Sequence, residues 1–394
     1  MNHDMSSSFD FETEVRREGS GSLKGQLGGE LKEKGIQDPI VLFGAEMDYP
    51  TAPCIRKRLE DFAREGIYGF TLADEAYLRA ICWWMRNMRG TEIRPEWILP
   101  VQGTTFALSI CVRALTEPGG KVLLMSPSYY RFDRAIMRNG REPIYSSLQL
   151  EEGEYQIDWT DLEEKMADPT CCLMVLVNPH NPTGKVFPPE DLAKIRDLSG
   201  KYQVTVFSDE IFAETAQPGH PAKMYAAVDS LGITCTSLGK AFNLTGVNQA
   251  NLILQSGSLR EKIQRQRDID HFGSIEPFFY QALLSAYTPE GADWIRAANE
   301  HTAANVRTIR KVLEEKTPKI RLLPVEGTFI GWLDCRDLKL SDEALQAFFE
   351  RAGIFADPGI EYGEDGCGFY RWNLATPAEK IRQALKRLEA AYHR

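Results

Sequence analysis

Four polar groups of this chain each follow a short apolar run, and each is of a type that can bind a ligand or react. They are the Gly103–Thr105 turn, the amide of Asn181 in NPHNPTG, the carboxylate of Asp209 in SDEI and the amine of Lys240 in SLGKAFNLTG. Taken singly, each has an ordinary explanation: a strand-to-helix turn, a proline-rich turn, a helix cap and a solvated surface lysine. Their occurrence after successive apolar runs favours a joint function.

The four groups together suit the chemistry of one cofactor. Backbone N–H groups at a helix start, as at Gly103, favour a phosphate. A carboxylate at the end of a buried strand is costly unless it meets a cation or a strong donor. A desolvated lysine loses its charge and becomes a nucleophile or base. Pyridoxal phosphate offers a phosphate, a pyridine nitrogen and an aldehyde to such groups, so the sequence predicts a pyridoxal 5'-phosphate site.

The apolar runs themselves have the pattern of buried strands. We predict strands at 97–101, 121–126, 171–177, 204–209, 233–238 and 250–255. Most are continuous and not alternating, which is typical of strands buried on both faces of a mostly parallel sheet, and helical patterns separate several of them. The fold class is therefore α/β. Ligands bind beyond the carboxyl ends of such strands, where Asn181, Asp209 and Lys240 fall.

Other segments complete a second, smaller unit. Helical patterns cover 55–66, 75–88, 106–115 and 298–316. The strands at 321–325, 328–334 and 369–375, with helices near 342–352 and 378–393, then predict an α+β C-terminal domain. Residues 1–40 are charged and rich in glycine and serine, which predicts an extended arm. Two domains agree with the length of 394 residues, because single cores stop growing beyond about 250–300 residues.

The composition of the chain argues against several kinds of partner and ligand. The net charge of −10 argues against nucleic acid or an anionic membrane as the main partner. Eight cysteines without a C-x-x-C pair are typical of buried free thiols in a reducing compartment, and the six histidines show no metal-ligand spacing. Neither a signal-peptide pattern nor a run of about 20 apolar residues is visible, so we expect a cytoplasmic enzyme.

Longer motifs resemble those of a known family. They are RREGSGSLK, GAEMDYPTAP, YGFT with DEAY, NPHNPTGKVF, SDEIFAE, SLGKAFNLTG, PVEGTFIGWLD and YRWNLATP. Over nearly the whole chain they resemble the fold-type I pyridoxal-phosphate enzymes of the class I/II aminotransferase group. Within it, the chain is most similar to the MalY/PatB-type cystathionine β-lyases, or cysteine C–S lyases. The resemblance implies an arm at 1–45, a large cofactor-binding domain at 46–285 with a mostly parallel seven-stranded sheet, and a small domain at 286–394.

The resemblance also implies a role for each cofactor contact. Lys240 would bind the cofactor aldehyde as a Schiff base and then move the Cα proton. Asp209 would keep the pyridine nitrogen protonated, and Asn181 would contact the phenolic oxygen and lie near the substrate. Tyr129 would stack on the ring. The groups implied to bind the phosphate are Gly103, Thr104, Thr105 and Ser237.

The remaining implied roles concern the substrate and a second subunit. Arg371 in YRWNLA would clamp the substrate α-carboxylate in bidentate fashion, with help from the backbone near Ala45. Tyr68 in YGFT would act in the site of the other subunit and reach its phosphate, which implies a homodimer with shared active sites.

Three positions depart from the family's usual residues. Phe212 stands where the family usually has histidine or tyrosine, and it cannot hydrogen-bond the phenolic oxygen. Asn248 replaces an arginine that usually holds the phosphate, and Gly239 stands where the lyases often have serine. These departures favour β-elimination from a cysteine S-conjugate or cystathionine and leave the substrate open. Transamination of an L-amino acid is the alternative, and a non-catalytic or regulatory use of the fold is a second one.

Overall fold

A seven-stranded sheet forms the centre of the computed structural model, which describes residues 9–36 and 38–394. The order of its strands is β2-β10-β9-β8-β7-β3-β4. Their bounds are β2 Ile98–Val101, β3 Lys121–Ser126, β4 Glu142–Ser147, β7 Cys171–Val177, β8 Thr205–Asp209, β9 Ile233–Thr236 and β10 Ala250–Leu254. Only β10 runs antiparallel to its neighbours in this sheet. The predicted mostly parallel seven-stranded sheet is therefore confirmed.

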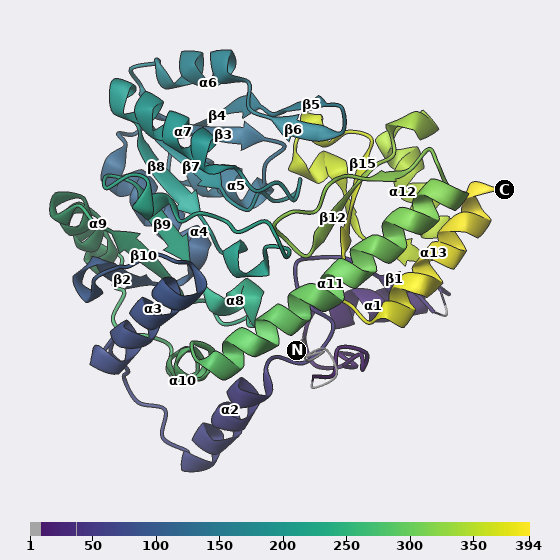
Figure 1. Ribbon diagram of the computed structural model, residues 1–394, viewed down its shortest axis with the longest axis horizontal. Helices are drawn as coiled ribbons and strands as arrows, with labels where there is room; N and C mark the ends of the chain where they lie inside the picture. The colour runs from purple at the N-terminus through teal and green to yellow at the C-terminus, as the bar shows by residue number, and fades with distance from the viewer. Residues whose placement is uncertain (1–8, 37) are drawn as a thin grey trace.

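Helices cover both faces of this sheet (Figure 1). In β3, Val122 and Leu124 pack with α4, α5 and α9, whereas Leu123 and Met125 pack with α6 and α7 on the opposite face. The helix bounds are α4 Gly103–Leu115, α5 Tyr130–Arg138, α6 Trp159–Met166, α7 Pro189–Tyr202 and α9 Gly257–Ile269. Burial on both faces is the physical reason for the continuous apolar runs.

A smaller antiparallel sheet in the C-terminal part has the order β11-β12-β15-β14. Its strands are β11 Arg321–Leu322, β12 Ile330–Asp334, β14 Asp357–Pro358 and β15 Phe369–Asn373, and it packs with α12 Asp342–Arg351 and α13 Ala378–Tyr392. Near it, β1 (Ile40–Val41) pairs in parallel with β13 (Ile354–Phe355). The α+β character predicted for this region is confirmed.

One long helix connects the two regions. Helix α11 (Pro289–Lys316) begins in the core around Trp294 and ends in the C-terminal core around Leu313, as its diagonal course in Figure 1 shows. Because it contributes to both cores, the domain boundary near residue 286 stays a prediction, as does the boundary near residue 45.

Two helices precede the large sheet in the chain, and a solvent-exposed connection joins them. They are α2 Pro53–Glu65 and α3 Glu75–Met88, and the short α8 Leu238–Ala241 and α10 Pro277–Ala286 pack near them. Gly66 ends α2 in the left-handed conformation at φ 69°, and Asp74 begins α3 by accepting from the Tyr77 N–H.

Two short strands, β5 Gln149–Glu151 and β6 Glu154–Gln156, form a separate hairpin.

The prediction of an extended arm over 1–40 is wrong for part of its length. Residues Leu23–Glu33 form helix α1, capped by the Ser22 hydroxyl, which accepts from the Gly25 N–H. Leu31 packs on Val41 and Phe355. Both residues lie outside the predicted arm, so its sequence alone does not indicate these contacts. The first eight residues of the predicted arm lie outside the described residues. In the part that the structure describes, no helix is both long and apolar enough to cross a bilayer.

A buried carboxylate ties α1 to the C-terminal region. Asp48 accepts from Lys24 Nζ at 2.7 Å, from Thr376 Oγ1 at 2.8 Å and from Lys380 Nζ at 3.1 Å. Burial alone would raise the pKa of Asp48, but the two ammonium groups outweigh it and lower that pKa to about 2. Asp48 is therefore ionised at neutral pH and pairs with ammonium groups from opposite ends of the chain.

We expect Asp48→Asn to lower the free energy of unfolding by about 3 kcal/mol, because it leaves buried ammonium groups without their counter-ion. Chemical denaturation followed by circular dichroism measures the change. Asp38→Asn is the matched control, since Asp38 pairs with Arg387 at the surface and its side chain is 80% exposed. Equal effects of the two substitutions would show that the Asp48 cluster does not stabilise the fold.

Candidate active site

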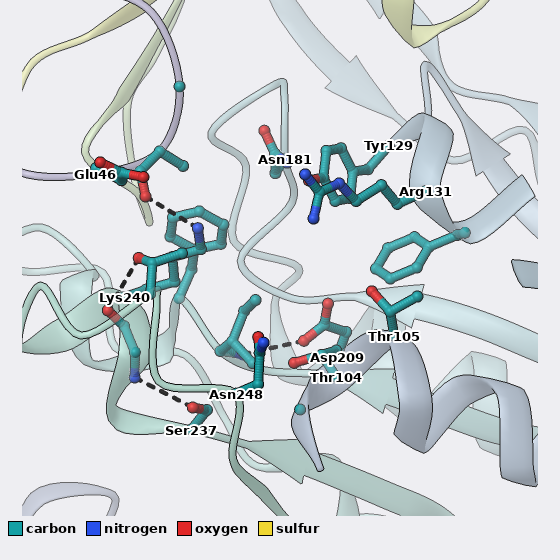
Figure 2. A pocket seen from close by; sticks show the side chains of 18 of the residues that line it. Glu46, Thr104, Thr105, Tyr129, Arg131, Asn181, Asp209, Ser237, Lys240 and Asn248 are labelled. Carbon is teal, nitrogen blue, oxygen red and sulfur yellow. Dashed lines mark hydrogen bonds between the residues drawn. The ribbon is translucent and has the colours of Figure 1, made fainter. Parts of the chain in front are cut away.

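One cavity of about 260 Å³ opens at the carboxyl ends of β7, β8 and β9 (Figure 2). The predicted site residues that line it are Ala45, Gly103, Thr104, Thr105, Tyr129, Asn181, Asp209, Ser237, Lys240 and Arg371. The parallel strands bring their ends to one edge of the sheet, so residues far apart in the chain meet there. Asp209 ends β8, Asn181 follows β7, and Lys240 lies in α8, just after β9.

The amine of Lys240 is withdrawn from solvent. Its Nζ donates to the Ala45 carbonyl at 2.9 Å and lies 5.6 Å from the centre of the Phe212 ring. Burial lowers the pKa of Lys240, and the positive charge of Arg371 lowers it further, to about 8. The neutral amine, which is the nucleophilic and basic form, is thus accessible near neutral pH.

Asp209 is a buried carboxylate with little support from its own chain. It is 3% exposed, and its Oδ1 accepts from the Ile211 N–H at 3.3 Å. Burial raises the pKa of Asp209 to about 7, despite the opposing effect of that N–H and of Lys240. A protonated ring nitrogen would supply the missing donor and charge, so this residue fits the pyridine end of pyridoxal phosphate.

The start of α4 fits the phosphate end. Gly103 is the first residue of this helix and has a φ of +76°. The side chain of the preceding Gln102 accepts no hydrogen bond from the first N–H groups of the helix. Thr104 and Thr105 face the same cavity, and Asn248 lies opposite Gly103. Uncapped N–H groups at the positive end of a helix favour an anion.

Ser237 is less available than predicted. Its hydroxyl donates to the Gln249 carbonyl at 2.8 Å and accepts from the Gly239 N–H at 3.1 Å. The single hydroxyl proton is therefore already engaged, and Ser237 would have to release Gln249 to donate to a phosphate. Its role as a phosphate ligand stays a prediction.

Arg371 projects from β15 and is held on two sides. Its Nε and Nη2 donate to Asp357 Oδ2 at 3.1 and 2.7 Å, and its Nη1 donates to Asn181 Oδ1 at 3.0 Å. Of the five guanidinium N–H groups, these bonds leave one on Nη1 and one on Nη2. Two adjacent donors suit a carboxylate, so the geometry is compatible with the predicted clamp.

The two predicted tyrosines have different positions. Tyr129 precedes α5 and lines the cavity. Tyr68 does not line it: its hydroxyl donates to the Ala63 carbonyl at 3.0 Å, and its side chain is packed against Phe62 and Phe278. Within one chain Tyr68 therefore lies outside the cavity that Lys240 lines, and its predicted action in a second subunit stays a prediction.

Sequence reasoning missed several residues of the cavity, namely Lys24, Glu46, Arg131, Asp357 and Tyr362. Asp357 and Tyr362 surround the Arg371 guanidinium, which lies 5.0 Å from the Tyr362 ring centre. No local motif marks these residues. Arg131 carries a sequence signal that was overlooked, because it is a basic residue in the first turn of a helix, where acidic residues are favoured.

We expect the Lys240 amine, in protein freed of cofactor, to become reactive as the pH rises through about 8. An ordinary lysine requires a pH near ~10.4 because only the neutral amine reacts. Arg371→Gln removes a positive charge and leaves Asp357 unpaired, so it should move this midpoint to higher pH. Reductive methylation across a pH series, read at Lys240 by mass spectrometry, measures it.

Arg371→Lys keeps the charge and serves as the matched control, while the exposed Lys319 is an internal reference in every sample. A Lys240 midpoint that is the same in the wild type and in the Gln variant would contradict the electrostatic coupling.

Comparison with known proteins agrees with this geometry. The model of the family "Aminotransferase class I and II" matches residues 38–388. The cystathionine beta-lyase PatB of Bacillus subtilis is 32% identical over 388 residues, which cover 97% of this chain and all of PatB.

Solved structures are similar over almost the entire length. A PLP-bound putative aminotransferase from Clostridium difficile has a TM-score of 0.92 at 29% identity, covering 98% of this chain and 100% of its own. The PLP-bound C–S lyase from Staphylococcus hominis has a TM-score of 0.89 at 26% identity, covering 98% of both chains. The predicted family, fold type and cofactor are thereby confirmed. The chain belongs to the aminotransferase class I and II family of fold-type I pyridoxal-phosphate enzymes.

Proposed function

We propose that this protein is a carbon–sulfur β-lyase that cleaves an L-cysteine S-conjugate or cystathionine and uses pyridoxal 5'-phosphate. The overall reaction consumes water and yields a thiol, pyruvate and ammonia. One observation carries the proposal: Lys240, Asp209 and Arg371 line one cavity, in which burial lowers the pKa of Lys240 to about 8 and raises the pKa of Asp209 to about 7. The similarity to PatB and to the C–S lyase of Staphylococcus hominis supports elimination as the reaction.

Some of these residues bind the substrate or the cofactor, and Lys240 transfers the proton. When bound, the cofactor supplies an electron sink that stabilises the charge left at Cα by proton removal. Arg371 holds the substrate α-carboxylate through its two free N–H groups and so orients the Cα–H bond. Lys240, neutral near its lowered pKa, takes the Cα proton. Asp209 retains the proton on the ring nitrogen by its buried charge.

Transamination is the competing function, and the putative aminotransferase of Clostridium difficile has the same fold. Both reactions begin with removal of the Cα proton and would use Lys240, Asp209 and Arg371 alike. The uncharged Asn248 beside the start of α4 and the apolar Phe212 favour the lyase. A non-catalytic scaffold is disfavoured because the chain keeps a desolvated lysine and a poorly supported buried carboxylate in one cavity.

A homodimer completes the proposal. The connection between α2 and α3 exposes a group of large apolar side chains: Ile67, Tyr68, Phe70 and Leu72, with Phe70 99% exposed. Exposed apolar groups of this size are typical of interaction surfaces. A second copy seated there would bury them and bring Tyr68 to the partner's phosphate site. We also propose a cytoplasmic location, in keeping with eight free cysteines.

We expect purified enzyme to release pyruvate and a free thiol in equal amounts from S-ethyl-L-cysteine or L-cystathionine. Lys240→Ala should lower this rate by at least about a hundredfold and abolish the visible absorbance of the bound cofactor, since it removes both the base and the Schiff-base amine. Thiol release and pyruvate formation are followed together. If the wild type instead forms a keto acid only when an amino acceptor is added, the protein is an aminotransferase.

We also expect two inactive variants to complement each other. Tyr68→Ala and Lys240→Ala should each have little activity, but a refolded mixture should regain it, because mixed dimers contain one site with both native residues. Thiol release before and after mixing measures the effect, and mixing Tyr68→Ala with itself is the control. An unchanged sum of activities would show that Tyr68 acts within its own chain or not at all.

A further inference from the structure

Arg131 extends into the cavity from an element that the mechanism does not otherwise use. It lies in the first turn of α5, two residues after Tyr129, and it lines the same cavity as Lys240 and Arg371. Figure 2 shows its guanidinium beside the Tyr129 ring and directed into the hollow. The residue is exposed, so it lies toward the solvent side of the site.

The charge of Arg131 has no carboxylate partner among residues 9–36 and 38–394. The groups that act on it are the hydroxyls of Tyr130 and Tyr129, which raise the pKa of Arg131. Its position is electrostatically unfavourable in the free protein, because the first turn of a helix is the positive end of the helix dipole. Tyr129, which precedes the helix, provides no side-chain cap.

Two other cations of the cavity are paired with carboxylates. Arg371 is paired with Asp357 at 2.7 Å, and Lys24 is paired with Asp48 at 2.7 Å. Lys240 has no carboxylate partner among the described residues either, but its Nζ donates to the Ala45 carbonyl at 2.9 Å and burial lowers its pKa to about 8. Of the two arginines that line the cavity, Arg371 therefore has a carboxylate partner within the described chain and Arg131 has none, and a carboxylate on a ligand would supply one.

We propose that Arg131 binds a carboxylate carried by the sulfur substituent of the substrate, so that the enzyme selects acidic cysteine S-conjugates. This inference rests on the proposed lyase function and adds the substrate class. Arg371 holds the α-carboxylate from β15, while Arg131 approaches from α5, so the two carboxylates are bound by different elements. A guanidinium pairs with a carboxylate through charge-assisted hydrogen bonds. Such a pair at Arg131 would position the sulfur substituent and leave the removal of the Cα proton by Lys240 unaffected.

Matched substrate pairs test this assignment. S-(2-Carboxyethyl)-L-cysteine and S-propyl-L-cysteine differ in the distal carboxylate and are similar in size. We expect Arg131→Gln to lower kcat/KM for the acidic conjugate by about tenfold, mainly through KM, and to leave the propyl conjugate nearly unchanged. Arg131→Lys should keep part of the preference. Arg131→Glu should reverse it in favour of S-(2-aminoethyl)-L-cysteine.

A binding measurement keeps the test independent of the reaction type. 3,3'-Thiodipropionate and 3-(propylthio)propanoate lack the amino group, so they bind without reacting. Calorimetric titration of the cofactor-loaded protein should show tighter binding of the dicarboxylate, and this advantage should disappear in Arg131→Gln. If the wild type releases no thiol but retains the difference in binding, the lyase proposal fails while the anion site stands.

Arg134→Gln is the control variant. Arg134 is an exposed arginine one turn further along α5, placed over the Tyr130 ring, and it does not line the cavity. It should leave both substrate and inhibitor preferences intact. Equal losses for acidic and neutral conjugates in Arg131→Gln, or a loss of bound cofactor measured by absorbance, would overturn the proposal and assign Arg131 to the cofactor phosphate instead.

Discussion

The Arg371 guanidinium joins the parts of the chain that enclose the cavity. It projects from β15 of the small sheet and donates to Asn181, which follows β7 of the large sheet. It also donates to Asp357, whose carboxylate in turn accepts from the Gly44 N–H of the segment after β1. A buried guanidinium with 3% exposure needs such partners, because an unpaired buried charge is strongly destabilising. These bonds leave two of the five guanidinium N–H groups without a partner among the described residues.

The two buried carboxylates Asp48 and Asp209 differ in how many hydrogen-bond donors and cations surround them. Asp48 is surrounded by ammonium and hydroxyl donors, and its pKa falls to about 2. Asp209 has one long hydrogen bond, and its pKa rises to about 7. The first arrangement stabilises a fold by itself. The second leaves a carboxylate whose electrostatic partner must come from a ligand, which is the usual signature of a binding or catalytic site.

Much of the fold could be predicted because its signals are local. Strands such as Cys171–Val177 are continuous apolar runs, and α3 has the bounds that its helical pattern predicts. Strand β4 and helix α1 are among the elements that were not predicted, and each has a physical reason. Strand β4 lies at the edge of the sheet and is partly exposed, so EPIYSS lacks an apolar run. Helix α1 is stabilised by Leu31 and Lys24 contacting distant residues, so its glycine-rich sequence resembles a loop.

By itself, the sequence determined the family and the cofactor, and it placed the candidate reactive residues at the ends of strands. Lys240, Asp209 and Asn181 each lie at or after the end of a strand, and parallel topology brings strand ends together without any further information. Only the tertiary structure decided the surroundings that set their ionisation: the Ala45 carbonyl at Lys240, Asp357 at Arg371 and Arg131 at the mouth. The reason is that hydrogen bonds and desolvation depend on distances between residues far apart in the chain, and no local pattern records those distances.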